Sequence, residues 1–169
     1  MFLRLRDGTA PVAVAFFSTR DGGKVRHMAL AETAFRFFTQ GHVKFYRATG
    51  GRFAGKRLLL LTTTGRKSGR KRVSPLMRID DGDNYLVAAS MGGAPRHPGW
   101  YHNLKDNPHV QVQVGGKIEN RTARIAAGSE RDRLWQKFVD ARQQFAGYQA
   151  RTDRIIPVVV LEPDNISSL

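Results

Sequence analysis

The chain carries a cluster of positive charge on a short segment that contains two glycines. Gly65 and Gly69 lie in this basic segment (residues 65–72), whose cationic side chains are Arg66, Lys67, Arg70, Lys71 and Arg72. Backbone amides in a tight glycine loop and arginine side chains both bind phosphate and carboxylate oxygens. The segment therefore predicts a site for an anion. The residues alone leave open a nucleic acid, a membrane surface, a phosphorylated cofactor, or a basic hairpin tip that is simply solvated.

Charge and composition narrow the class of protein. The 169 residues have a formal net charge of +14, and no acidic residue lies between Glu32 and Asp80. Such an excess bears on partners and solubility rather than on the fold. The chain has no cysteine, which excludes disulfides, thiolate nucleophiles and cysteine metal sites. The composition is typical of a soluble globular protein, for which we expect a cytoplasmic location.

Other catalytic motifs are weak. His97 and His102 are five residues apart across Pro98, with no carboxylate or third histidine at ligand spacing, so we predict no metal site. The glycine spacing of the basic segment differs from a Walker loop, and no serine occupies a nucleophile elbow. Three aspartates between residues 80 and 83 crowd a turn that they are expected to shape.

A second group of residues suits a planar ligand. Ser90 and the pair Gly92–Gly93 follow an apolar run, and two glycines there permit close backbone approach. Trp100, Tyr101 and Asn103 follow His97–Pro98. In one interpretation Trp100 only anchors a short helix in the core. In the other, a planar ligand lies against this helix and beside the glycines.

The elements that must position these residues are mostly strands. Alternating or apolar runs bounded by turn residues predict strands at 57–64, 72–80, 85–90, 110–114, 117–125 and 155–161. Short turns join most of them, which favours a small β-barrel with helical cover over alternating βαβ units. Pro157 predicts that the last strand lies near a sheet edge.

Helical patterns flank and interrupt these strands. A helix is predicted at 99–105, another after a capping box of Ser129 and Asp132, and a partly helical stretch as far as Arg154. An amphipathic helix at 29–46 either covers the domain or touches an anionic membrane. Residues 1–28 are expected to form a loosely ordered extension, 29–163 a single domain and 164–169 a tail.

In combination, several short motifs resemble the deazaflavin-dependent nitroreductase family, whose members bind coenzyme F420. The resemblance extends from about residue 37 to 163. It is carried by residues 60–69 with Arg72 and Pro75, by 88–90 and 92–93, by 97–98, 100–104 and 107–108, and by 148–149, 151–154 and 156–159.

The resemblance implies a mainly β fold with flanking helices, a split β-barrel of the flavin-binding type. It implies hydride transfer from reduced F420 to a quinone-like or nitroaromatic acceptor. The phosphate and glutamate tail would be held by Arg66, Lys67, Ser68, Gly69 and Arg72. The deazaflavin would be lined by Ser90, Gly92, Gly93, Trp100, Tyr101 and Asn103. Further cofactor-binding residues would be Pro75, Met91, His97 and Pro98. Tyr148 and Ser90 are the predicted catalytic residues.

The resemblance also carries expectations about partners and substrate. Homodimers and peripheral contact with an anionic membrane are both implied, because relatives include dimers and membrane-associated menaquinone reductases. Met91 stands where relatives often carry lysine. Some relatives place three tyrosines at the positions of Arg142, Phe145 and Tyr148, of which this chain keeps one. The acceptor is therefore less well determined than the cofactor.

Three alternatives to an F420-dependent oxidoreductase remain at this stage. Flavin mononucleotide could occupy the same barrel, and cofactor absorbance separates the two. A carrier could bind the deazaflavin or a lipid without turnover. A nucleic-acid-binding domain would need aromatic residues beside the basic segment for base stacking, and that segment has none, so no nucleic acid is expected.

Overall fold

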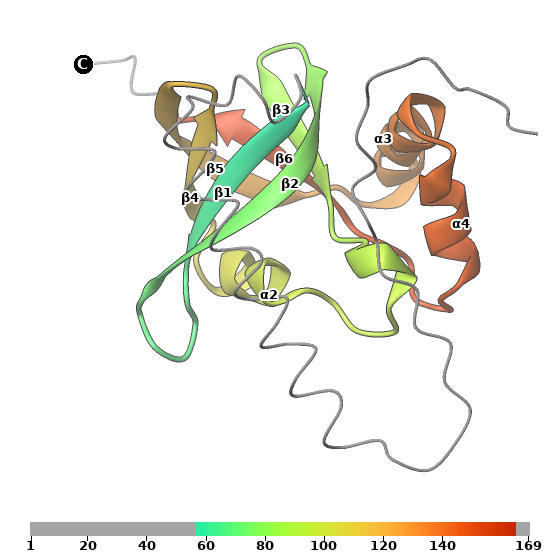
Figure 1. The fold of residues 1–169 in the computed structure, drawn as a ribbon, viewed down its shortest axis with the longest axis horizontal. Coiled ribbons are helices and arrows are strands. Elements are labelled where there is room, and N and C mark those ends of the chain that lie inside the picture. The colour runs from blue at the N-terminus through green and yellow to red at the C-terminus, as the bar shows by residue number, and fades with distance from the viewer. Residues whose placement is uncertain (1–56, 165–169) are drawn as a thin grey trace, which may run out of the picture.

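The structure, a computed structural model, describes residues 57–164, which form a closed antiparallel barrel. Its strands follow the order β1-β2-β3-β6-β5-β4 (Figure 1). Their bounds are β1 Leu58–Thr64, β2 Lys71–Asp81, β3 Asn84–Ala88, β4 His109–Val114, β5 Lys117–Ile125 and β6 Val158–Pro163. The predicted mainly β fold with flanking helices is confirmed. The predicted extension 1–28, the helix at 29–46 and most of the tail lie outside the described residues.

Tight turns set the register of the barrel. Asp81 pairs with Asn84, which leaves a two-residue turn between β2 and β3 where Gly82 has φ +61°. Val114 pairs with Lys117 in the same way. Two-residue hairpins favour residues that accept positive φ, because their backbone twist then matches that of the strands. The turn predicted at residues 80–83 is confirmed.

The prediction that the last strand lies near an edge is wrong. β6 pairs with β3 on one side and with β5 on the other. Pro157 is compatible with this place because it lies just before Val158, the first residue of β6. Because it lies outside the strand, its missing amide hydrogen breaks no hydrogen bond between strands. Its carbonyl accepts a hydrogen bond from the Ala89 amide at 2.9 Å.

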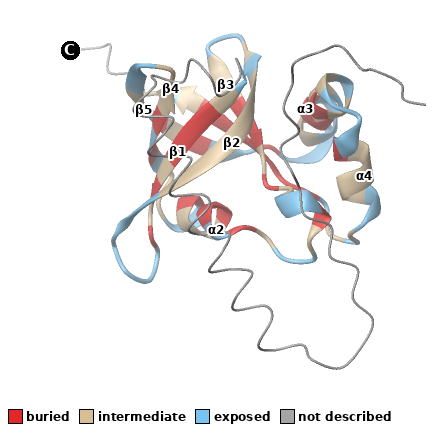
Figure 2. Cartoon of the chain, in the orientation of Figure 1, coloured by how far each residue is buried: buried red, intermediate tan, exposed pale blue. Residues whose placement is uncertain are grey.

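One apolar core fills the barrel. Strand residues that alternate along the chain, such as Leu59 and Leu61 of β1, are fully buried in it. Helix α2 (Gly99–Asp106) closes one end by adding Trp100, Tyr101 and Leu104 to the same cluster (Figure 2). Pro98 immediately precedes this helix, as predicted, because proline lacks the amide that the first turn leaves unpaired.

A second core lies outside the barrel. Helices α3 (Gly128–Ala141) and α4 (Gln144–Ala150) cover the outer face of β3 and β6 (Figure 1). Phe138 of α3 is fully buried against this face, where Val158 and Val160 project outward. The alternation along β6 thus supplies both cores.

The predicted capping box at the start of α3 is wrong. The helix begins at Gly128, its N-cap is Ala127, and no side chain caps it. Ser129 is already inside the first turn, two residues after the capping position. Glu130 instead binds Arg124 of β5 through two hydrogen bonds of 2.7 and 2.9 Å.

The chain leaves β3 through a short 3-10 turn, Met91–Gly93, that packs against α4. Gly93 is buried and has φ +82°. A Cβ atom on Gly93 would lie 2.5 Å from the Tyr148 carbonyl oxygen, so α4 requires glycine there. Gly92 also has positive φ, +66°, but a Cβ there would meet nothing within 4 Å.

The two glycines make a matched pair for measuring this contact. We expect Gly92→Ala to lower the free energy of unfolding by about 1–2 kcal/mol, the cost of a left-handed backbone in an L-residue. Gly93→Ala adds a backbone clash to that strain and should cost clearly more. Urea denaturation of both variants provides the measurement. Equal losses would contradict the contact between the turn and α4.

Candidate cofactor site

The basic segment comprises the loop between β1 and β2 and the first two residues of β2, and it has a defined backbone. The Gly65 amide donates to the Arg70 carbonyl at 2.9 Å, and the Gly69 amide donates to the Gly65 carbonyl at 2.7 Å. Gly69 has φ +63°, a conformation that favours glycine. Residues 66–72 are exposed (Figure 2), so their cationic side chains extend from a fixed turn into solvent.

Asn103 of α2 attaches this loop to the barrel. Its Oδ1 accepts a hydrogen bond from the Arg66 amide at 3.2 Å, and its Nδ2 donates to Thr63 Oγ1 at 3.0 Å. Thr63 is fully buried, which makes it a fixed acceptor. Asn103, predicted to bind the cofactor, thus also couples the basic segment to α2.

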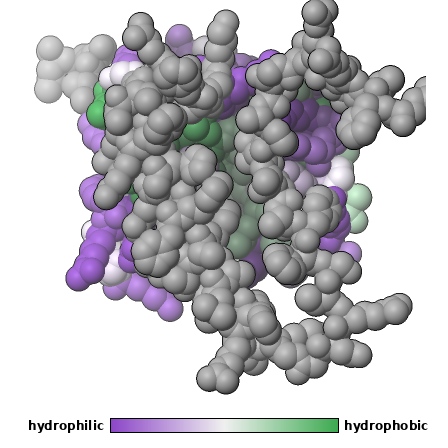
Figure 3. All heavy atoms as spheres, viewed as in Figure 1, coloured by the Kyte–Doolittle hydropathy of each residue, from purple (hydrophilic) through white to green (hydrophobic). Residues whose placement is uncertain are grey.

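The charge of the basic segment is not neutralised by the described part of the chain. Within residues 57–164, none of its five cations forms an ion pair, whereas Arg124 binds both Glu130 and Glu162. Figure 3 shows hydrophilic surface at the lower left, where Figure 1 places this loop. Cationic donors on a fixed glycine turn suit a phosphodiester and carboxylates, the groups of the F420 tail.

The β3–α2 connection (residues 89–98) is held by one arginine. Arg154 Nε donates to the Ala94 carbonyl at 2.8 Å, and Nη2 donates to the Ser90 and Ala89 carbonyls at 2.9 and 3.1 Å. Burial lowers the pKa of Arg154, since it removes water from the charged group. The guanidinium thereby fixes the backbone on both sides of Met91–Gly93.

The aromatic residues of α2 face the barrel interior. Trp100 and Tyr101 are 7% and 8% exposed, and burial raises the pKa of the Tyr101 hydroxyl despite the opposing charge of Arg154. The His97 ring lies 4.7 Å from the Tyr101 ring, tilted by 37°. These contacts give Trp100 and Tyr101 a packing role, and a cofactor contact through them stays a prediction.

Tyr148 lies beside the same connection. Its ring is half-buried, 5.4 Å from Phe145, with the Arg151 guanidinium 5.9 Å from the ring centre. Because the Gly93 backbone packs on the Tyr148 carbonyl, the fold brings the turn after Ser90 next to Tyr148. Phe145 itself is buried against Phe138 at 5.2 Å, so it belongs to the outer core.

The predicted residues divide between two places at one end of the barrel. The loop of the basic segment lies on one side of α2, and Met91–Gly93 with α4 lies on the other (Figure 1). Pro75 is set apart from both, inside β2 and opposite Leu60. Within residues 57–164, no three potential metal-ligating side chains gather at one place.

Sequence reasoning assigned no role to Arg154, Gln149 or Arg131. Arg131 donates to Gln149 Oε1 at 3.1 Å and to the Ile156 carbonyl at 2.7 Å. Gln149 in turn donates to the Arg154 carbonyl at 2.8 Å. Gln149 and Arg154 belong to motifs that carry the family resemblance, but those motifs do not show what the side chains contact.

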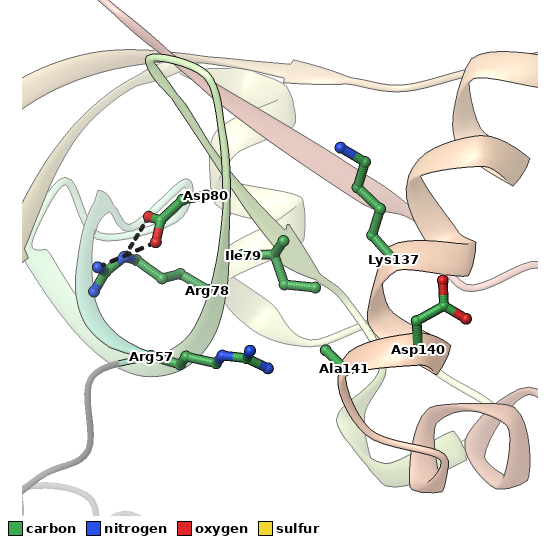
Figure 4. A pocket seen from close by; sticks show the side chains of 7 residues that line it. All are labelled: Arg57, Arg78, Ile79, Asp80, Lys137, Asp140 and Ala141. Carbon is green, nitrogen blue, oxygen red and sulfur yellow. Dashed lines mark hydrogen bonds and ion pairs between the residues drawn. The ribbon is translucent and has the colours of Figure 1, made fainter.

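A separate hollow lies between β2 and α3 (Figure 4). It has a volume of about 530 Å³, and its lining comprises Arg57, Arg78, Ile79, Asp80, Lys137, Asp140 and Ala141. Arg78 pairs with Asp80 at 2.8 Å inside it, and Lys137 pairs with Asp81 at 2.6 Å. None of the predicted site residues lines this hollow. Its charges are of both signs, which does not favour an anionic ligand.

Comparison with known proteins identifies the family. A family model described as F420H(2)-dependent quinone reductase matches residues 35–163. The chain belongs to this family. An F420H(2)-dependent quinone reductase of Mycobacterium tuberculosis strain H37Rv is 46% identical over 129 residues, covering 71% of this chain and 86% of the relative.

Solved structures agree with this assignment. One is described as an F420-H2 dependent reductase and is 49% identical, with a TM-score of 0.59 over 63% of this chain and 95% of its own. Another, described as a domain-swapped dimer, is 41% identical, with a TM-score of 0.61 over 82% and 100% of the two chains.

The comparisons confirm four predictions. These are the family resemblance, the split-barrel class, the F420-dependent oxidoreductase activity and F420 as the cofactor. The flavin mononucleotide alternative is set aside. No helix within residues 57–164 is long and apolar enough to span a membrane.

The basic segment generates a direct prediction about affinity. We expect Lys67→Ala and Arg72→Ala each to weaken F420 binding roughly tenfold, because each removes a charge-assisted contact to the tail. Both side chains are exposed, so thermal unfolding should be unchanged. F420 fluorescence titration provides the measurement.

Arg133→Ala is the matched control, since it removes one exposed positive charge from α3. The control should bind F420 like the wild type. Wild-type affinity in both basic-segment variants would exclude this loop from the site.

Proposed function

We propose that this protein transfers a hydride from reduced F420 to a quinone and releases the quinol. The observation that carries the proposal is the basic segment, whose cations form no ion pair within residues 57–164 and lie on a fixed glycine turn that Asn103 joins to α2. An anionic tail bound there would leave the ring free to reach the β3–α2 connection. The names of the relatives support a quinone as the acceptor.

The protein's own contribution is binding and orientation. Bound reduced F420 supplies the hydride, so the chain needs no redox-active side chain of its own. The basic segment anchors the tail, and the backbone of the β3–α2 connection limits the position of the ring. Fixing donor and acceptor at reacting distance can lower a barrier by roughly 7–11 kcal/mol at best.

The acceptor side requires a proton as well as a hydride. A quinone takes up one hydride and one proton to become a quinol, and the proton goes to an oxygen. Tyr148, half-buried beside Met91–Gly93, is the proposed donor, with the Ser90 hydroxyl as the alternative donor on the facing segment. A positioned donor of this kind contributes a factor of about 10²–10⁴ to a rate.

Two further expectations concern assembly and location. The domain-swapped dimer of a relative supports the proposal that this protein forms homodimers, which sedimentation velocity would test. Peripheral contact with an anionic membrane through residues 29–46 remains a prediction, because that segment lies outside the described residues. Vesicle co-sedimentation with and without anionic lipid would test it.

The proposed activity has a simple test. Purified protein is mixed with reduced F420 and menadione, and F420 reoxidation is followed in a single turnover. We expect saturable F420 binding that weakens with salt, as ionic contacts require, and one quinone reduced per F420 oxidised. Tight binding of F420 without reoxidation by any quinone would contradict the proposal and would favour a carrier.

Tyr148 makes a separate prediction. Tyr148→Phe removes the hydroxyl but keeps the ring contact with Phe145, so the rate of quinone reduction should fall at least about tenfold with little change in F420 affinity. Tyr85→Phe is the matched control at the other end of β3, and it should turn over like the wild type. If Tyr148→Phe lowered F420 affinity but left the rate of quinone reduction unchanged, the proton-donor role would be excluded.

A further inference from the structure

Arg154 is the strongest unassigned feature near the proposed ring position. Its guanidinium contacts four acceptors on the β3–α2 connection: the carbonyls of Ala89, Ser90 and Ala94 and Nδ1 of His97, at 2.8–3.1 Å. These acceptors flank Met91–Gly93, which has positive φ at all three residues. A backbone of this conformation is strained at Met91, and it persists only where its surroundings hold it.

The chemistry of the arginine suits this task. A guanidinium presents five donors in a planar fork, whereas a lysine ammonium is a compact point charge. Within residues 57–164, Arg154 forms no ion pair with a carboxylate. Its N–H groups donate to backbone carbonyls and to one imidazole instead. The side chain is only partly exposed, which limits competition from water.

Arg154 is itself fixed from the helical layer. Gln149 of α4 donates to the Arg154 carbonyl at 2.8 Å and accepts from the Ile156 amide at 3.0 Å. Arg131 of α3 donates to Gln149 and to the Ile156 carbonyl. A continuous set of hydrogen bonds therefore extends from α3 through α4 to the β3–α2 connection, and Tyr148 precedes Gln149 directly.

We propose that Arg154 is a positioning residue that sets the β3–α2 connection, and with it Ser90, against Tyr148 for hydride transfer. The inference rests on the proposed function, since it assumes that the deazaflavin ring lies at this connection. Arg154 reaches the ring only through the backbone that it holds. Its loss should therefore affect the orientation of the ring more than the binding of the tail, which the basic segment holds independently.

His97 makes this arrangement sensitive to pH. A guanidinium can only donate, so His97 Nδ1 must be unprotonated to accept from Arg154 Nη1 at 3.0 Å. Burial is the largest cause that lowers the pKa of His97, followed by the charges of Arg154, His102 and Lys105. Tyr101, whose ring packs on His97, is a further titratable neighbour.

The sign of this effect follows from the lowered pKa. The unfolded chain has the ordinary histidine pKa near 6.5 and binds the proton more readily than the folded protein. The contact with Arg154 therefore contributes fully above about pH 6.5. Its contribution is lost as the pH falls from there through the lower pKa of the folded state.

The test compares two arginines that both bind carbonyls. Arg154→Lys is paired with Arg121→Lys, because Arg121 is 5% exposed and donates to the Asp83 and Leu161 carbonyls at the opposite end of β3 and β6. Both variants should lose stability. Hydrogen–deuterium exchange without F420 and single-turnover rates with reduced F420 and menadione are measured for each.

In Arg154→Lys we expect amide exchange in residues 89–97 to rise roughly fivefold or more, the effect of one ordinary hydrogen bond. The single-turnover rate should fall at least about tenfold, as expected for a misplaced reactant, while F420 affinity changes little. Arg121→Lys should change neither quantity. The inference would be overturned if Arg154→Lys kept the wild-type exchange and the wild-type single-turnover rate. It would also be overturned if Arg121→Lys changed both quantities as much as Arg154→Lys does.

His97→Asn provides an independent readout. We expect the wild-type rate to fall as the pH drops through the lowered pKa of folded His97, which lies below the ordinary value of about 6.5. Asparagine keeps an acceptor oxygen near the place of Nδ1 but cannot be protonated, so this fall should disappear in the variant. An unchanged pH profile in the variant would count against the inference. If the wild type binds F420 but reduces no quinone, the proposed function fails, and the exchange comparison alone then decides whether Arg154 holds the connection.

Discussion

Closure of the barrel through the pairing of β1 with β4 is the constraint on which the site depends. Leu60 to Thr62 of β1 pair with Gln111 to Gln113 of β4, although β2, β3, the 3-10 turn and α2 lie between these strands in the chain. After β3 the chain must cross the open end of the barrel to reach β4. The β3–α2 connection and α2 make that crossing, and the buried face of α2 plugs the end. The loop of the basic segment emerges at the same end.

Electrostatics then distinguishes this end from the rest of the molecule. On β5 and α3, several cations pair with carboxylates, as Arg124 does with Glu130 and Glu162. At the basic segment and at Arg154, the described residues supply backbone and hydroxyl acceptors instead. Positive charge left without carboxylates attracts an anionic ligand and orients it. That property suits a cofactor whose tail carries several negative charges and whose ring must be held at a defined distance.

Local chemistry made much of this predictable from sequence. Turn residues such as Gly82 and the alternation along the strands depend on neighbours in the chain, and the predicted barrel followed from them. Pro157 led to the wrong prediction that the last strand lies near a sheet edge. A closed barrel has no edge, and only the long-range pairing of β6 shows that the barrel is closed. Arg154 could not be assigned a role, because its four acceptors lie 57–65 residues away in sequence. Phe145 illustrates the same limit, since its burial against α3 is a tertiary property.

The central claim is that the F420 tail binds the basic segment while the ring lies at the β3–α2 connection. An experimental structure of the protein with oxidised F420 tests it most directly. The account predicts phosphate and carboxylate oxygens within hydrogen-bond distance of Lys67 and Arg72, and the deazaflavin beside Ser90 and the backbone of Met91–Gly93. A cofactor bound in the hollow between β2 and α3, or a tail that avoids the basic segment, would contradict it.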